Sequence, residues 1–362
     1  MIDCFNKGGL EGRHVLVANY ESGSVGVLPT LADGTPLCTL EGWQDNPHAW
    51  VKLWKHHAAQ PEADRINAVA RERGEAWLPR YGGKISSEWF YSKALQILDE
   101  APEIYAAADR LIEAADWVIW RLTGRETRNS CTAGYKAIWS KREGFPDSDY
   151  FAALDPRFAD VVDSKMSRDI SSIGEKAGEL TEEAAAWTGL RPGTAVAVAN
   201  VDAHVSVPAA TVTEPGRMVA VMGTSICHMV MGEQTADVEG MCGVVEDGIL
   251  PGLFGYEAGQ SAVGDIFGWF VDNLVPAEYF EQAEREGLDV HWRLDGVLQS
   301  IGTFPQGEAA DVVSRLKVLA GVLGTSSIFQ SGWNAEKCIG TSGPRCSTTQ
   351  RVILSSSASE SF

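Results

Sequence analysis

Apolar residues recur every three or four positions in the first third of the chain, which is the spacing of helices with one buried face. The clearest stripe begins after Pro102 and stops before Gly124, so it predicts one long helix. Its apolar members are Ile104, Ala108, Leu111, Ala115, Val118 and Leu122. An earlier stripe predicts a helix that stops near Pro61, and it carries Trp50, Leu53, Trp54 and His57. A third helix is expected over roughly Glu88 to Leu98.

A short helix is also expected after Thr181, because several end signals coincide there. The Thr181 hydroxyl can cap the first turn, which contains Glu182 and Glu183, and Gly189 provides a stop. From Thr194 the period changes to that of strands punctuated by Gly and Pro. The expected strands lie in TAVAVANV, RMVAVMGTS and ICHMVMGE, and a further helix is expected at Ser261 to Asp272. Helices followed by strands indicate a mixed α/β chain.

The best domain boundary in the sequence is Thr211 to Gly216, which is short, polar and interrupted by Pro215. The two ends of the chain have no regular pattern. Residues 1–28 fit neither period, and residues 341–362 hold seven Ser and three Thr, so the last part of the tail is predicted to be disordered.

Composition narrows the class of protein. A chain of 362 residues with 44% apolar residues can build a sizeable core. The formal net charge of -19, without a basic cluster, argues against nucleic acid as a partner. Seven scattered cysteines and the absence of an apolar leader or long apolar run predict a reduced, cytoplasmic protein that does not contact membranes.

The common nucleotide and hydrolase motifs are missing: GxxxxGK[ST], GxGxxG, HExxH and GxSxG do not occur. Gly223, Thr224 and Ser225 join two apolar runs. Such a turn can aim backbone N–H groups and hydroxyls at a phosphate, or it can be an ordinary hairpin turn. Both interpretations are open from the sequence.

Asp202 follows the apolar run Ala195 to Ala199, so we expect it at the end of a buried strand. There its carboxylate could accept a proton from a hydroxyl group, or it could cap a turn. His204 would share a face with Asp202 if the strand continued, and we interpret it as structural. Lys136 and Glu257 lie among small and aromatic neighbours, as in a sugar or anion pocket, although each could be an exposed charge.

Several long strings together resemble the bacterial FGGY carbohydrate kinases that phosphorylate L-ribulose. They are DNPHAWVKLWKHHAA, LPRYGGKISSEW, NSCTAGYKAIW, NVDAHVSVPA, MGTSICHM, EGMCGVVEDGILPG and GYEAGQSAVGDIFGWF. The resemblance covers about Leu28 to Leu294. It implies two actin-like, ribonuclease-H-like α/β domains, with residues 29–213 in an incomplete sugar-binding domain and residues 214–294 at the start of the nucleotide-binding domain.

The implied reaction is the phosphorylation of L-ribulose to L-ribulose 5-phosphate by ATP with Mg²⁺, in arabinose catabolism. By resemblance, Asp202 is the general base, Lys136 and Glu257 bind the sugar, and Gly223, Thr224 and Ser225 form the phosphate hairpin. Two alternatives from other classes stay open. One is a sugar-binding remnant without catalysis, and the other is a glycosidase that uses Asp202 and Glu257 as a carboxylate pair. The sequence leaves the oligomeric state open, a homo-oligomer included.

Both ends depart from the family. Residues 1–28 lack its first strand and DxGT-type phosphate loop, and residues 295–362 match none of its adenine-binding segment. We therefore hypothesise that both ends are out-of-frame translations that flank an authentic middle. Translation of the neighbouring DNA in all three frames tests this hypothesis, which is wrong if the missing motifs appear in no frame.

Overall fold

The computed structural model describes residues 26–54, 57–222, 226–260, 263–287, 290 and 351–355. Two compact units divide the chain. The first comprises Met1–Pro208 with Met231–Glu257, and the second comprises Ala209–Val230 with Ala258–Phe362. The strands β8 and β10 each begin in one unit and end in the other.

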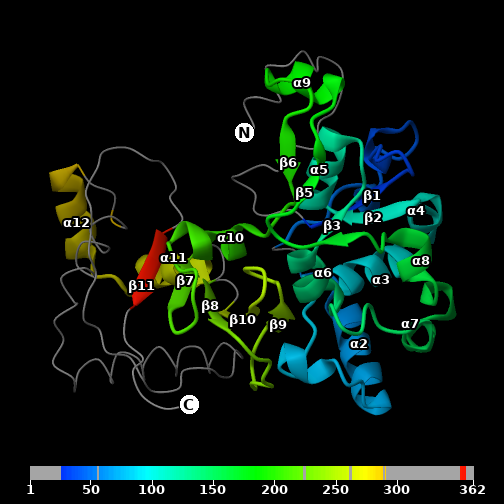
Figure 1. The fold of residues 1–362 in the computed structure, drawn as a ribbon. Helices are drawn as coiled ribbons and strands as arrows, with labels where there is room; N and C mark the ends of the chain where they lie inside the picture. The colour runs from blue at the N-terminus through cyan, green and yellow to red at the C-terminus, as the bar shows by residue number, and fades with distance from the viewer. Residues whose placement is uncertain are drawn as a thin grey trace. The chain divides into compact units, whose positions relative to one another are not determined.

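The first unit is a mixture of helices and short strand pairs (Figure 1). Its strands are β1 (Val27–Thr30), β2 (Arg110–Glu113), β3 (Arg128–Asn129), β4 (Ile170–Ser171), β5 (Lys176–Glu179), β6 (Ala195–Ala197), β9 (Gly243–Glu246) and β10 (Phe254–Gln260). The pairs β1–β2, β5–β6 and β9–β10 are antiparallel, and β3–β4 is parallel. Short 3-10 helices occur at Leu37–Thr39, Pro47–Ala49, Leu78–Tyr81 and Pro156–Phe158.

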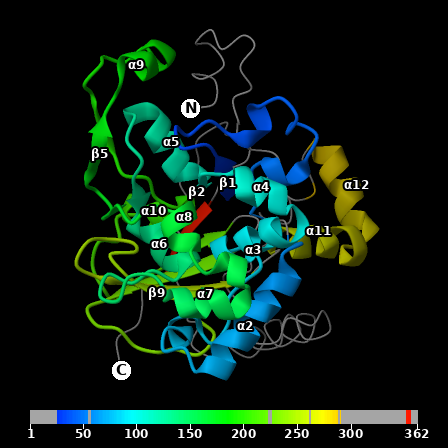
Figure 2. The same cartoon turned by 90° about the vertical axis from the view of Figure 1, so that its right-hand side faces the viewer.

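The α-helices of the first unit are α2 (Gln60–Arg73), α3 (Phe90–Glu100), α4 (Pro102–Ala107), α5 (Ala114–Thr123), α6 (Ser130–Ala137), α7 (Ser148–Leu154), α8 (Val161–Lys165), α9 (Glu182–Thr188) and α10 (Asp202–Ala209). The main core lies where α2, α3 and α7 pack together (Figure 2). Aromatic rings pack against one another within it, and the ring centroids of Tyr91 and Phe151 are 4.7 Å apart. Helix α3 is buried along Phe90 to Leu98, which makes it the central helix of this unit.

The second unit contains β7 (Met218–Met222), most of β8 (Ile226–Gly232), α11 (Val263–Leu274), α12 (Ala277–Glu286) and β11 (Arg351–Ser355). Strand β7 pairs antiparallel with β8 and also with β11. Part of the tail that the sequence predicts to be disordered is therefore a strand. Its apolar run, Val352, Ile353 and Leu354, includes β-branched residues, which favour strands. The rest of that tail lies outside the described residues.

Several predicted elements are confirmed: α3, α9, β7, β8 and α11. Helix α9 has the expected ends, because the Thr181 side chain accepts a hydrogen bond from Ala184 N and Gly189 adopts the left-handed conformation. None of the helices in the described part of the chain is long and apolar enough to cross a bilayer. The described cysteines, Cys38, Cys131, Cys227 and Cys242, form no disulfide.

The predicted long helix between Pro102 and Gly124 is wrong at its centre. The chain forms α4, then strand β2, then α5. Leu111 and Ile112 are both buried, and β2 pairs in register with β1 from Val27↔Glu113 to Thr30↔Arg110. Tertiary pairing with a distant strand has overridden the local apolar spacing.

The predicted helix that stops near Pro61 is also wrong, because a helix begins there. Pro61 lies in the first turn of α2, where proline is favoured. The preceding segment runs beside β1 instead, since Lys52 N donates to Val27 O at 2.8 Å and Gly26 N donates to Lys52 O at 2.8 Å. These two bonds carry the chain past β1 before α2 starts.

Candidate functional site

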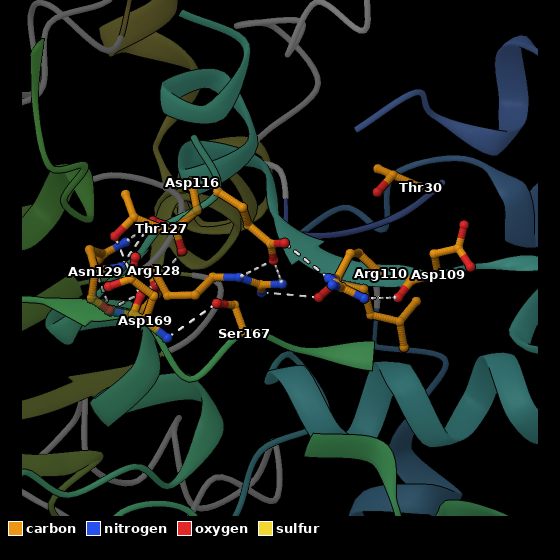
Figure 3. Close-up of polar contacts among 12 residues, drawn as sticks. Thr30, Asp109, Arg110, Asp116, Thr127, Arg128, Asn129, Ser167 and Asp169 are labelled. Atoms are coloured by element: carbon orange, nitrogen blue, oxygen red, sulfur yellow. Dashed lines mark hydrogen bonds and ion pairs between the residues drawn. The ribbon is translucent and has the colours of Figure 1, made fainter. Parts of the chain in front are cut away.

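A buried polar network fixes the start of helix α6, which carries Lys136 (Figure 3). Asn129 caps the helix, and its Oδ1 accepts from Thr132 N at 2.8 Å. Asp116, in the first turn of α5, accepts from Asn129 N at 3.1 Å and from Asn129 Nδ2 at 2.7 Å. All three residues are buried. The bonds therefore tie the first turns of α5 and α6 together.

Arg128 extends this network toward strand β2 (Figure 3). Its Nη1 donates to Leu111 O at 3.0 Å, and its Nη2 lies 2.9 Å from Glu126 Oε1. Glu126 also accepts from Arg110 Nε at 2.9 Å. Arg128 is buried, so these charge-assisted bonds are shielded from water. They hold β2, which ends at Glu113, near the base of α6.

The native protein is expected to lose stability as the pH rises from about 4 to about 6, and we predict that Asp116→Asn removes this loss. Burial raises the pKa of Asp116 to about 6, against the opposing effects of Arg128 and Asn129. From about pH 4 to about pH 6 the unfolded chain releases a proton that the folded chain retains, so folding stability falls as pH rises. At about 1.4 kcal/mol per pKa unit the loss approaches ~3 kcal/mol in the native protein.

Urea unfolding of both proteins across this pH window measures the difference in their free energies of unfolding. Asp163→Asn is a suitable control, because Asp163 is exposed and its carboxylate pairs with Arg168 at 2.8 Å. A difference between native protein and Asp116→Asn that stays constant from pH 4 to pH 7 would contradict the prediction.

Lys136 points into a cage of one carboxylate and one aromatic ring. Its Nζ lies 3.3 Å from Glu113 Oε2 and 4.8 Å from the centroid of the Trp54 ring. The side chains of Lys136 and Glu113 are 11% and 7% exposed. Burial would lower the pKa of Lys136, but the negative charge of Glu113, with a smaller contribution from Asp202, raises it. Lys136 is therefore a fixed positive charge at neutral pH.

A second buried lysine, to which the sequence did not point, lies beside this pair. Lys93 of α3 donates from Nζ to Leu53 O at 2.7 Å and lies 5.7 Å from the centroid of Trp54. Burial lowers the pKa of Lys93 to about 8 despite the favourable charge of Glu113. The available signal was a lysine in the middle of a helix whose other residues are nearly all buried. Two ammonium groups thus share one ring and one carboxylate.

The setting expected for Asp202 is wrong in two respects. The run before it forms only the short strand β6, which within the described ranges pairs with β5 alone, and Ala195 and Ala197 are exposed. Asp202 then begins helix α10, where a carboxylate is favoured by the helix dipole. The Asp202 side chain is exposed, whereas His204 is buried on the same helix. The two side chains do not share a strand face.

His204 faces Glu257, which the sequence marked as a sugar-binding candidate. The His204 Nε2 atom lies 3.3 Å from Glu257 Oε2, with side-chain exposures of 3% and 15%. The Tyr135 ring packs on the imidazole at a centroid separation of 4.3 Å. Tyr135 directly precedes Lys136 in α6, so this contact links the histidine to the helix that carries the lysine.

Glycines surround the Tyr135 ring because side chains would not fit there. A Cβ atom at Gly243 would lie 2.5 Å from Tyr135 Cδ1, and one at Gly248 would lie 2.7 Å from Cε2. A Cβ atom at Gly255 would collide with the Tyr135 hydroxyl. Strand β9, strand β10 and the turn between them thus approach the ring more closely than any other residue type would permit.

We predict that Gly243→Ala destabilises the protein by about 1–3 kcal/mol, the usual cost of overpacking a tight core. Gly268→Ala is the matched control, since Gly268 lies within α11 and a Cβ there has nothing within 4 Å. The control is expected to be neutral or stabilised by up to ~1 kcal/mol, because alanine favours helix. Urea unfolding distinguishes the two, and equal stabilities would contradict the close approach seen at Tyr135.

The expected phosphate residues, Gly223, Thr224 and Ser225, lie outside the described residues. The strands that flank them, β7 and β8, are present as predicted. In the described ranges no group of three or more His, Cys, Asp or Glu side chains could hold a metal ion. No step below depends on a metal ion held by these side chains.

Known proteins resemble the chain in sequence along most of its length. Residues 218–314 match the C-terminal domain of the FGGY family of carbohydrate kinases. The ribulokinase of Halalkalibacterium halodurans is 56% identical over 287 residues, which is 79% of this chain and 51% of that protein. The ribulokinase of Mycolicibacterium smegmatis is 57% identical over 269 residues, 74% of this chain and 47% of that protein. The chain thus spans about half the length of the curated relatives it matches.

The fold resembles that of solved xylulose kinases. The crystal structure of xylulose kinase from Rhodospirillum rubrum matches with a TM-score of 0.53 at 22% identity, over 67% of this chain and 46% of that one. The ligand-bound xylulose kinase from Lactobacillus acidophilus matches with a TM-score of 0.53 at 14% identity, over 72% and 50%. At these identities the likeness concerns the fold alone.

Proposed function

The chain belongs to the FGGY family of carbohydrate kinases, and we propose on this premise that it phosphorylates the terminal hydroxyl of L-ribulose with ATP. The observation that carries the proposal is the arrangement of charges in the first unit. Lys136 is held by Glu113 beside the Trp54 ring, Glu257 is held by His204, and the exposed carboxylate of Asp202 lies close enough to raise the pKa of Lys136.

Each residue has a role that its setting supports. Lys136 donates hydrogen bonds to sugar oxygens, Glu257 accepts from sugar hydroxyls, and the flat Trp54 ring covers an apolar face of the sugar. Asp202, exposed at the start of α10, accepts the proton of the terminal hydroxyl. These side chains can orient an uncharged sugar, because they contact its oxygens, its hydroxyl groups and its apolar face.

The transfer needs no covalent bond between the sugar or the phosphate and the protein. The sugar oxygen forms a bond to the γ-phosphorus of ATP, the bond from that phosphorus to the bridging oxygen breaks, and ADP leaves. The hydroxyl proton goes to Asp202. Backbone N–H groups and hydroxyls of Gly223, Thr224 and Ser225 would contact the ATP phosphates. The product is L-ribulose 5-phosphate.

A coupled assay for ADP with L-ribulose, ATP and Mg²⁺ tests the proposal on the full chain, together with calorimetry for each ligand. We expect L-ribulose to bind and ADP to form in proportion to phosphorylated sugar. Absence of ADP formation with L-ribulose, ATP and Mg²⁺ present would refute it.

A second candidate function is L-ribulose binding without phosphoryl transfer. It is favoured by one observation, that Lys136, Asp202 and Glu257 all belong to the first unit. The same measurements separate the two candidates. Sugar binding without ATP binding or ADP formation supports the second candidate and excludes the first.

A further inference from the structure

We propose that His204 is a positioning residue, whose imidazolium holds the carboxylate of Glu257 in the orientation in which it binds the sugar. The inference rests on the proposed function, because the sugar-binding role of Glu257 belongs to that proposal. His204 would act through Glu257 and need not touch the substrate.

The contact between the two side chains is an ion pair that is shielded from water. His204 Nε2 lies 3.3 Å from Glu257 Oε2, and the side chains are only 3% and 15% exposed. A carboxylate so deeply placed is costly unless a positive charge or a set of donors compensates it. His204 provides that charge from the first turn of α10, while Glu257 comes from β10.

His204 can fix the carboxylate because it is itself fixed. The Tyr135 ring packs on the imidazole at 4.3 Å, and Gly243, Gly248 and Gly255 leave that ring no space to move. The imidazole therefore presents Nε2 to Glu257 from a rigid support. A support of this kind lowers the entropy cost of holding one carboxylate rotamer for the ligand.

The charges around the imidazole keep it protonated. The titratable groups that face it are Cys131 and Tyr135 from α6 and Glu257 from β10. Burial alone would lower the pKa of His204, but Cys131 and Glu257 outweigh burial and raise it to about 10. The His204–Glu257 ion pair thus stays intact across the neutral range.

The experiment follows the imidazole directly, by long-range ¹H–¹⁵N NMR of the full chain labelled at its seven histidines. His204→Gln assigns the signal of His204. We expect the native imidazole to stay protonated above pH 8, and we expect the pKa of His204 to be lower in Glu257→Gln, where the charge of that carboxylate is missing. An unchanged His204 titration in Glu257→Gln would overturn the proposal.

Calorimetry then measures the effect on the sugar. His204→Gln is expected to weaken L-ribulose binding at least tenfold. The matched control is His48→Gln, which removes a histidine–glutamate pair of similar length, 3.2 Å to Glu100, and should leave affinity unchanged. Equal affinities in His204→Gln and the control would also overturn the proposal.

If His204→Gln fails to fold, the double variant His204→Gln/Glu257→Gln tests the ion pair instead, because it leaves no buried charge unpaired. The double variant should melt at a higher temperature than His204→Gln alone, whereas additive melting losses would count against the pair. If the native chain shows the His204 titration shift but binds no L-ribulose, the proposed function fails and the ion pair stands. The two failures are therefore distinguishable.

Discussion

Replacing Asp202 with asparagine is expected to lower the rate of L-ribulose phosphorylation by at least ~100-fold, the usual contribution of a general base. Asparagine has the same shape but cannot accept the proton of the sugar hydroxyl. Lys136, Glu257 and Trp54 remain, so L-ribulose affinity should change by less than about threefold. The coupled ADP assay gives the rate, and calorimetry gives the affinity.

The matched control for this variant is Asp149→Asn. Asp149 is an exposed aspartate in the first turn of α7, as Asp202 is in the first turn of α10. The control removes the same helix-terminal charge and should keep its full rate. An Asp202→Asn protein that retains more than a tenth of the native rate would show that another group accepts the proton.

The sequence predicts an element well where its end signals are local. Helix α9 is an example, since Thr181, its acidic first turn and Gly189 are all within nine residues. Strands β7 and β8 are predicted by short apolar runs on either side of a glycine. The mixed α/β sugar kinase fold is confirmed by the structural relatives, although the chain covers only part of each.

The elements that the sequence mispredicts depend on distant partners. The spacing of Leu111 suits a helix, but β2 pairs with β1 about eighty residues earlier in the chain. Similarly, β6 is only three residues long where the sequence predicts a buried strand, and the chain turns into α10 at Asp202. Strand pairing over such separations leaves no local periodic signal.

The candidate site also combines residues that the sequence points to with residues that only the folded chain reveals. Resemblance pointed to Lys136, Asp202 and Glu257, and the structure places these residues in one unit. The resemblance did not point to the residues that hold these three side chains in place. Glu113 lies 23 positions before Lys136, and His204 lies 53 positions before Glu257. A buried charge needs a partner, so each of these residues is required by a contact that only the folded chain brings together.

Replacing Lys136 with methionine is expected to abolish measurable L-ribulose binding and to destabilise the protein by about 3–5 kcal/mol. The two losses have different causes. Binding is lost because charged donors to the sugar disappear, each worth about 1.5–3 kcal/mol. Stability is lost because the Glu113 carboxylate, only 7% exposed, is left without its partner at 3.3 Å.

The double variant Glu113→Gln/Lys136→Met separates these causes. Removing both charges should restore most of the stability, since an unpaired buried carboxylate is no longer present, but it should not restore sugar binding. Lys176→Met is the control, because the Lys176 and Glu179 side chains are more than half exposed and such pairs contribute at most ~1 kcal/mol. Urea unfolding and calorimetry give both quantities. Full sugar binding in the double variant would mean that Lys136 acts only as the structural partner of Glu113, and the ammonium group at the sugar site would then have to be that of Lys93, which shares the Trp54 ring.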